Sequence, residues 1–327
     1  MKKNILSSLL IMILSFSLFA TTSNNKPTLD LLTKVSDSYI SYKTTKNTTE
    51  YLFGVWPQTK KANNVSIDTS TTKDINGWKC YKGSDNCYYV KETAKPYDLY
   101  SFDDGTVIEE NKEYYFLLEP IVWQLLDNNY QNGKLLVSKK ILQSGSFCTS
   151  TNERDIYLSN YEKSSIRAWL NGINGSKYDV EDYSNKGFIN KAFSKQGIQN
   201  IKNINVDNSI NSTSYIDNDL KKVSKYTSNN TNDKIFLLSG KEVADEKYFT
   251  DDLSRIKQTT DYARAKTTYS NSSPKNMNNG WYWLRSPTKN NGNIGSGVRY
   301  DGQANLSYTI SHDRIAGGIV PSLVIPN

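Results

Sequence analysis

Short hydrophobic blocks separated by polar, turn-forming stretches predict a chain of short strands with a few helices. Apolar and aromatic runs bounded by Gly, Pro, Asn and Asp indicate strands at 51–56, 114–118, 121–126, 134–138, 235–238, 281–284, 298–300 and 319–325. Asp301-Gly302 after one of these runs is typical of a tight two-residue hairpin turn.

Helical spacing of apolar residues is found in the middle of the chain. Residues 164–172 place Ile166, Trp169 and Leu170 on one face and end at Gly172, a common C-terminal stop. Residues 188–193 repeat that spacing, and residues 239–242 have the spacing of a capping box, which predicts a third helix. The fold class expected is therefore α+β, with short antiparallel strands, two or three helices and long polar loops.

Polar segments divide the chain into unequal parts. Residues 1–20 have the pattern of a signal peptide, residues 21–48 that of a flexible polar tether, and residues 49–327 that of a single domain. Within this domain, residues of about 200–233 are nearly all polar and predict a long mobile insertion.

Composition agrees with this division. The hydrophobic share is only 37%, but aromatic residues make up 12%, and disordered chains are poor in aromatics. Much of the polar excess falls in the tether, in the insertion and in the loop after Pro274. The low hydrophobic content therefore describes a domain with a Tyr/Trp-rich core and long polar insertions.

The N-terminal segment predicts export. Lys2 and Lys3 precede an apolar run at 5–19, and the small residue Ala20 precedes a polar stretch, so cleavage after Ala20 is expected. A retained membrane anchor is the alternative, but the run is shorter than the ~18–20 apolar residues that span a bilayer. No later segment is long and apolar enough to span one. We expect an exported protein, periplasmic, on the cell surface or secreted, with no membrane association after the signal is removed.

Charge and histidine content exclude several functions. The net charge of +7 falls to +5 without Lys2 and Lys3, and the lysines are scattered, so no nucleic-acid partner is expected. The single histidine, His312, rules out metal sites that need two or three imidazoles. A Ser-His-Asp triad would have to use His312, and no G-x-S-x-G motif accompanies it. We expect no metal, no cofactor and no assembled catalytic set.

Expected export makes a disulfide possible for the cysteines, because disulfides persist outside the cytoplasm. Cys80 and Cys87 flank a turn-forming stretch, and a hairpin with a Cys80–Cys87 disulfide across its arms is expected. Cys148 is then the odd cysteine. It could be a reactive thiol, but with no histidine nearby a buried or unpaired position is favoured.

Several ordered blocks resemble one bacterial family. They include S-I-R-x-W-L-N at 165–171, F-L-L-S at 236–239 and W-L-R-S-P at 283–287, together with 53–58, 119–126, 136–142 and 192–194. Jointly they resemble the exported domain of unknown function 6273, from about Phe53 to Leu323. The last third is more distantly similar to the C-type-lectin-like fold of formylglycine-generating enzymes, which implies a C-type-lectin-like mixed domain.

The more distant resemblance does not bring its chemistry with it. Those enzymes end on a Gly-Val-Arg-Pro-Ala-Leu-type segment, where this chain has Val320 in place of the arginine. Their catalytic cysteine pair lies late in the chain, and no cysteine follows Cys148 here. The multi-histidine iron site of the related sulfoxide synthases cannot be built from one histidine.

A few residues are candidates for ligand contact or for structural roles. Trp281, Arg299 and Tyr300 are candidate ligand-binding residues, since aromatic faces suit sugar rings; for Trp281 a place in the core is an equal alternative. Arg285 is expected to be a buried partner of a carboxylate, with Glu119 as the partner to test. Structural roles are also expected for Trp123, Arg167, Trp169 and Trp283.

Other patterns are weaker. The glycine-rich stretch 292–297 lacks the Lys-Ser/Thr of a phosphate-binding loop and reads as a flexible loop. The acidic pairs at 103–104, 109–110 and 251–252 do not have EF-hand spacing. A carboxylate pair of a glycosidase depends on distances in three dimensions and stays open.

These observations leave three hypotheses. The first is an exported, non-catalytic binding module for a glycan or a host or cell-surface protein. The second is an enzyme, either of the formylglycine-generating-enzyme-like superfamily or a carboxylate-based cell-wall hydrolase. The third is a structural surface component without a small ligand.

Overall fold

The computed structural model describes residues 33–34, 49–149, 157–176, 180–213, 226–288, 292–309 and 316–327. The predicted signal peptide, most of the predicted tether and His312 lie outside these ranges. None of the described helices is both long and apolar enough to cross a bilayer.

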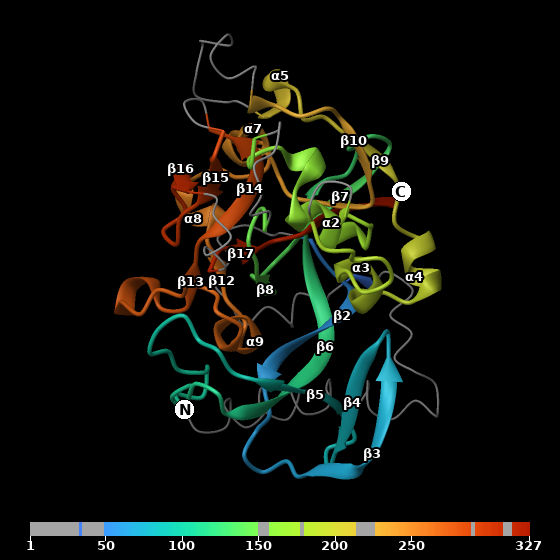
Figure 1. Cartoon of the computed structure of the whole chain (residues 1–327), viewed down its shortest axis with the longest axis vertical. Helices are drawn as coiled ribbons and strands as arrows, with labels where there is room; N and C mark the ends of the chain where they lie inside the picture. Colours follow the sequence, from blue (N-terminus) through green and yellow to red (C-terminus); the bar gives the residue numbers. More distant parts are fainter. Residues whose placement is uncertain are drawn as a thin grey trace, which may run out of the picture.

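The described chain is organised around two larger sheets, one antiparallel and one mixed, shown in Figure 1. The larger sheet has nine strands: β1 (Thr33–Lys34), β2 (Glu50–Lys60), β3 (Ile67–Ile75), β4 (Trp78–Gly83), β5 (Tyr88–Thr93), β6 (Glu113–Asp127), β7 (Gly133–Ser138), β11 (Ile235–Phe236) and β18 (Ser322–Pro326). The smaller one has five: β8 (Gln143–Ser144), β14 (Tyr282–Pro287), β15 (Ile294–Val298), β16 (Ala304–Thr309) and β17 (Gly318–Ile319). Two two-stranded sheets pair β9 (Ile204–Val206) with β10 (Thr231–Asp233), and β12 (Lys257–Gln258) with β13 (Asn279–Gly280).

The helices of the described chain are short. They are α2 (Ser165–Asn171), α3 (Phe188–Ala192), α4 (Lys195–Gln199), α5 (Ile210–Thr213), α7 (Gly240–Ala244), α8 (Asp252–Arg255) and α9 (Asp261–Ala265), with 3₁₀ turns η2 (Tyr161–Lys163) and η5 (Pro274–Asn276). The three predicted helices correspond to α2, α3 and α7, and the capping box of α7 is present. The other four were not predicted from the sequence; they are four or five residues long, too short for a full helical repeat of apolar residues. The mixed α and β composition is confirmed, with sheet dominating.

Strand β6 is the central element of the larger sheet, and it corrects the prediction of two separate strands. It runs unbroken for 15 residues through Pro120 and pairs with β2, β5 and β7. The register of β2 against β6 shifts between Leu52 and Val55, next to the position where Val55 faces Pro120. The irregular register at this position accommodates proline, which has no N–H to donate to the neighbouring strand. The hydrophobic pattern predicted two strands on either side of this residue.

The end of the chain joins the two sheets. The predicted closing strand at 319–325 is divided into β17, in the smaller sheet, and β18, in the larger one. Because β17 pairs with β8 and β14 while β18 pairs with β7 and β11, two residues carry the chain from one sheet to the other. In Figure 1 the β3–β4 hairpin lies at one end of the long axis, with α5, α7 and β14–β16 toward the other.

The core is a continuous hydrophobic cluster, rich in aromatic residues, between the sheets and helices α2 and α3. Trp123 is fully buried and donates its indole N–H to the Phe53 carbonyl at 2.7 Å. Trp56 packs at 5.0 Å from the ring of Phe188 and at 6.0 Å, edge-on, from Trp169. Both Trp123 and the half-buried Trp169 therefore pack in this cluster.

The polar insertion is partly folded, which corrects the expectation of a mobile segment at 200–233. Strands β9 and β10 pair within it, with Thr231 opposite Val206, and α5 follows β9. Residues 214–225 lie outside the described part. Ile201, Ile204 and Val206 pack in the core, and Asn208 bonds to residues 229–231. Three apolar residues spread over a polar stretch are too few to show a periodic pattern.

The predicted Cys80–Cys87 disulfide is wrong, although the hairpin that was expected around it is present as β4 and β5. All three cysteines are free. Cys80 lies opposite Val90 in the β4–β5 ladder, and Cys87 lies in the turn, where its carbonyl accepts from the Gly83 amide at 2.8 Å. The turn is shorter than the sequence spacing suggested, so the two cysteines do not face each other. Cys148 is fully buried, as favoured.

Candidate functional site

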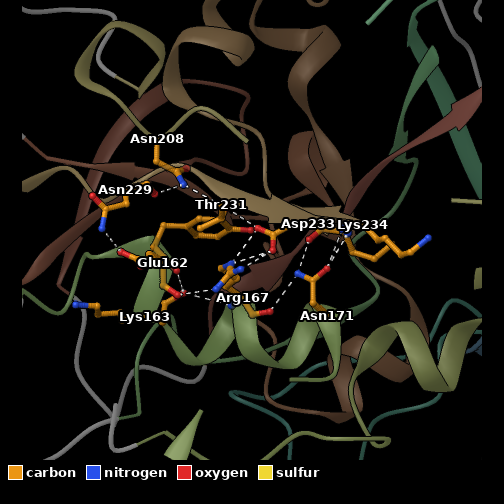
Figure 2. A network of polar contacts seen from close by, with 12 residues as sticks. Glu162, Lys163, Arg167, Asn171, Asn208, Asn229, Thr231, Asp233 and Lys234 are labelled. Atoms are coloured by element: carbon orange, nitrogen blue, oxygen red, sulfur yellow. Dashed lines mark hydrogen bonds and ion pairs between the residues drawn. The ribbon is translucent and has the colours of Figure 1, made fainter. Parts of the chain in front are cut away.

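The S-I-R-x-W-L-N block meets the end of the polar insertion at a buried ion pair between Arg167 and Asp233, drawn in Figure 2. The Arg167 guanidinium donates from Nε to both carboxylate oxygens of Asp233, at 3.0 and 2.9 Å, and from Nη2 to one of them at 2.8 Å. Asp233 is 2% exposed and also accepts from Thr231 at 2.7 Å. This geometry fixes α2 against the end of the insertion, so the structural role expected of Arg167 is the one that its contacts describe.

Asn171 extends the same network by one helical turn (Figure 2). Its Oδ1 accepts from the amides of Lys234 and Ile235, at 3.1 and 3.0 Å, and its Nδ2 donates to the Ile235 carbonyl at 2.7 Å. The side-chain amide thus acts as a neighbouring strand would, and it satisfies the backbone at the start of β11. Arg167 and Asn171, the two residues with long polar side chains in the 165–171 block, therefore both contact the segment at 233–235.

A second buried pair joins the other two blocks. Arg285, fully buried in β14, donates Nη1 to Glu242 at 2.6 Å and to the Leu237 carbonyl at 2.7 Å. Burial alone would raise the pKa of Glu242, but the Arg285 charge and hydrogen bonds outweigh it and hold that pKa below its usual value. Arg285 Nη2 also reaches the Asp207 carbonyl at 3.3 Å, so this arginine anchors the insertion.

The expectation that Arg285 pairs with Glu119 is therefore wrong in its partner. Glu119 lies on β6 and accepts from the amide and hydroxyl of Thr59, at 2.9 and 2.6 Å. The burial of Arg285 follows from its place in an apolar strand. The choice among carboxylates depends on which helix packs beside that strand, and α7 brings Glu242 there.

A pair of close carboxylates is present, and its contacts are structural. Asp103 and Asp261 both accept from Nη2 of Arg264, whose side chain is fully buried. Asp261 also accepts from the amides of Lys60 and Asp103, at 2.9 and 2.8 Å. With both of its oxygens occupied by protein donors, Asp261 ties α9 to β2 and to the loop between β5 and β6.

A row of three tyrosines forms the exposed aromatic feature that we take as the candidate site. Tyr97 is 56% exposed, while Tyr269 and Tyr300 are half-buried. The rings of Tyr97 and Tyr269 lie 6.1 Å apart, and those of Tyr269 and Tyr300 also lie 6.1 Å apart. The row brings together the loop between β5 and β6, the segment after α9 and the turn between β15 and β16.

Polar groups flank this row. Asn271 donates its side-chain N–H to the Tyr269 hydroxyl at 3.3 Å. The Arg299 guanidinium lies 5.4 Å from the centre of the Tyr300 ring and donates from Nε to Asp301 at 2.7 Å. That hydrogen bond lowers the pKa of Asp301, so the carboxylate stays charged at neutral pH. Aromatic faces beside fixed polar groups are the usual elements of a small-molecule site.

Trp281, the other candidate ligand-binding residue, and its neighbour Trp283 are both buried. Trp283 is 1% exposed and donates its indole N–H to the Gly145 carbonyl at 2.9 Å. Trp281 is 6% exposed, with its ring 4.8 Å from that of Trp283. The alternative of a core position therefore describes Trp281, whereas Arg299 and Tyr300 lie at the exposed row.

Tyr97 and Tyr269 were not singled out from the sequence. Each is an isolated tyrosine in a polar stretch, Pro96-Tyr97-Asp98 and Thr268-Tyr269-Ser270, and an aromatic residue in such surroundings is a weak signal for an exposed contact. Nothing in the sequence brings the two stretches together. Among the described residues, no group of three or more His, Cys, Asp or Glu side chains is arranged to hold a metal ion.

One family profile, described as "Domain of unknown function (DUF6273)", matches residues 132–326. The chain belongs to this family. The match covers the Arg167–Asp233 and Arg285–Glu242 pairs and includes Tyr269 and Tyr300, whereas Tyr97 and strands β2–β6 precede it. No curated protein and no solved structure matches the chain.

Proposed function

We propose that this family member is an exported, non-catalytic binding module that holds a glycan on the Tyr97–Tyr269–Tyr300 row. The observation that carries the proposal is the row itself, three tyrosine rings from distant segments at successive spacings of 6.1 Å. A pyranose ring presents a face of C–H groups that packs on an aromatic face, and its hydroxyls need polar partners at the edge. Asn271 and the Arg299–Asp301 pair supply such partners.

The surroundings of the row favour binding over catalysis. Its acidic neighbour Asp301 is engaged by Arg299, the exposed Asp103 pairs with Arg264, and the buried Asp261 is held by Arg264 and by backbone amides. An acid–base pair for hydrolysis needs one carboxyl group free to protonate the leaving group and another facing the sugar. A C-type-lectin-like architecture remains part of the proposal, supported by the short antiparallel strands and long loops.

Export and the site are separate parts of the proposal. The apolar N-terminal segment supports export to the periplasm, the cell surface or the medium, and a surface glycan or a protein at the cell surface would be encountered there. No nucleic-acid partner, membrane association, metal or cofactor is proposed.

A glycan array probed with the mature chain, residues 21–327, tests the ligand class, and titration of a hit gives its Kd. Replacing one tyrosine of the row by alanine should weaken binding roughly 2- to 12-fold, because an aromatic contact contributes about 0.5–1.5 kcal/mol beyond its buried area. Tyr157→Ala is the matched control. Tyr157 is 41% exposed but packs against Tyr226, away from the row, so its replacement should leave the Kd unchanged.

Absence of any array signal for the folded chain would reject the glycan proposal. A hit whose Kd responds to Tyr157→Ala but not to Tyr97→Ala would place the site elsewhere. Binding to a surface protein with the same dependence on the row would keep the site and change the ligand.

A further inference from the structure

We propose that Lys257 and Gln124 become joined by an intramolecular isopeptide bond, in which the Lys257 amine replaces the amide nitrogen of Gln124 and ammonia is released. This modification site lies apart from the tyrosine row and does not depend on the proposed glycan binding.

The two reacting side chains already lie together in the folded chain. Lys257, in β12, is 2% exposed, and its Nζ lies 3.3 Å from Oε1 of Gln124 in β6. The residues are 133 positions apart in sequence, so only the fold brings them together. An amine within hydrogen-bonding distance of a carboxamide oxygen is also close to the carbonyl carbon, which is the atom that it would attack.

A buried carboxylate stands beside the same carboxamide. Glu50 lies directly opposite Gln124 in the β2–β6 ladder, and side chains of directly paired residues lie on the same face of the sheet. Glu50 is 4% exposed and accepts from Lys139 Nζ at 2.6 Å. This ion pair holds the carboxylate on the side of the sheet that carries Gln124.

The amine is in the right state to react. Burial lowers the pKa of Lys257 to about 7; the charge of Lys139 lowers it further, and that of Glu50 opposes the shift. A substantial fraction of the side chain is therefore the neutral amine at neutral pH. A lysine that is desolvated beside another cation is activated as a nucleophile in this way.

The step balances without an external reagent. The Nζ lone pair forms a bond to Cδ of Gln124, and the amine gives up one proton to the Glu50 carboxylate. The tetrahedral intermediate then expels the Gln124 nitrogen, which takes that proton from Glu50 and leaves as ammonia. The product is a secondary amide between β6 and β12, and Glu50 is regenerated.

Such a bond would tie the segment that precedes the family match to the segment within it. Since none of the three cysteines forms a disulfide, the isopeptide bond would be a covalent tie of a different kind for a protein proposed to work outside the cell.

Mass spectrometry of the purified, denatured chain tests the proposal. We expect a mass below the sequence mass by one molecule of ammonia. A tryptic digest should then contain a branched peptide that joins residues 113–134 to residues 256–264, with no cleavage after Lys257. Recovery of 113–134 as a linear peptide together with cleavage after Lys257 would overturn it, and so would an ammonia loss located at another residue.

Variants identify the participating groups. Lys257→Met and Gln124→Leu should restore the full sequence mass, while Glu50→Gln should slow formation roughly 100-fold or more, as expected for loss of a general base. Lys79→Met is the matched control, because Lys79 is an exposed lysine on β4, and it should retain the ammonia loss. Because the wild-type digest is decisive by itself, poor folding of a variant does not leave the question open.

Discussion

At the scale of single residues, buried charges are what organise this chain. Arg167, Arg264 and Arg285 each meet a carboxylate that is largely or wholly withdrawn from water, at Asp233, Asp261 and Glu242. Each pair connects segments that the hydrophobic pattern treats as separate or holds a short helix in place. A buried charge that loses its partner is strongly destabilising, so these arginines are structural requirements.

The pair of Arg285 and Glu242 gives a direct prediction. Replacing Arg285 by Met should lower the free energy of unfolding by about 3–5 kcal/mol, because it leaves Glu242 buried without its cation. Chemical denaturation at pH 7 measures this. Lys112→Met is the control, since its bond to Glu109 joins two exposed side chains and should contribute at most about 1 kcal/mol. Equal losses for the two variants would contradict the assignment.

The same pair predicts how stability changes with acid. The pKa of Glu242 is lower in the folded chain than its usual value, so the unfolded chain takes up the proton first as the pH falls. The stabilisation is therefore complete above the ordinary glutamate pKa of about 4.3 and is lost below it. Glu242→Gln should flatten this part of the stability profile between roughly pH 5 and pH 3. An unchanged slope in that window would argue against the ion pair.

At the scale of elements, helix ends were readable from sequence and strand ends were not. Gly172 was expected to stop α2 and does so, with φ of 60°. The capping box of Ser239 and Glu242 was likewise expected and is present. These signals are local, since they involve residues three or four positions apart. The length of β6 and the division of the closing strand depend on partners far along the chain, which no local pattern contains.

Two physical effects oppose a side chain at Gly172: backbone strain at a positive φ and a steric clash with a neighbouring residue. A Cβ at Gly172 would lie 2.0 Å from Oδ1 of Asn190, whereas at Gly105, which also has a positive φ of 82°, nothing lies within 4 Å. Gly105→Ala should therefore cost only the backbone strain of about 1–2 kcal/mol. Gly172→Ala should cost more, because it adds a clash with the cap of α3. Thermal unfolding compares them, and a smaller loss at Gly172 than at Gly105 would refute this account.

At the scale of the whole molecule, the proposed export predicts the residue at which the exported chain begins. If export occurs as proposed, the protein isolated from the cell envelope or the medium should begin at Thr21, since cleavage is expected after Ala20. N-terminal sequencing by mass spectrometry measures this. Protein found only in the membrane fraction with residues 1–20 still attached would instead support the retained anchor.

The sequence by itself determined the mixed composition of the fold, the family and the burial of Arg285, Trp123 and Trp283. It did so because hydrophobic periodicity and capping residues are patterns among neighbouring positions, and the order of the motif blocks can be read directly along the chain. It also ruled out multi-histidine sites, since a site cannot be built from residues that are absent.

Only the tertiary structure decided which groups meet. It paired Arg285 with Glu242 in place of Glu119, kept Cys80 and Cys87 apart, placed Trp281 in the core and brought Tyr97 and Tyr300 next to Tyr269. It also set Lys257 against Gln124. Except for the two cysteines, which the β4–β5 turn keeps apart, these outcomes depend on packing between segments tens to more than a hundred residues apart. Such contacts are set by positions in space and not by order along the chain.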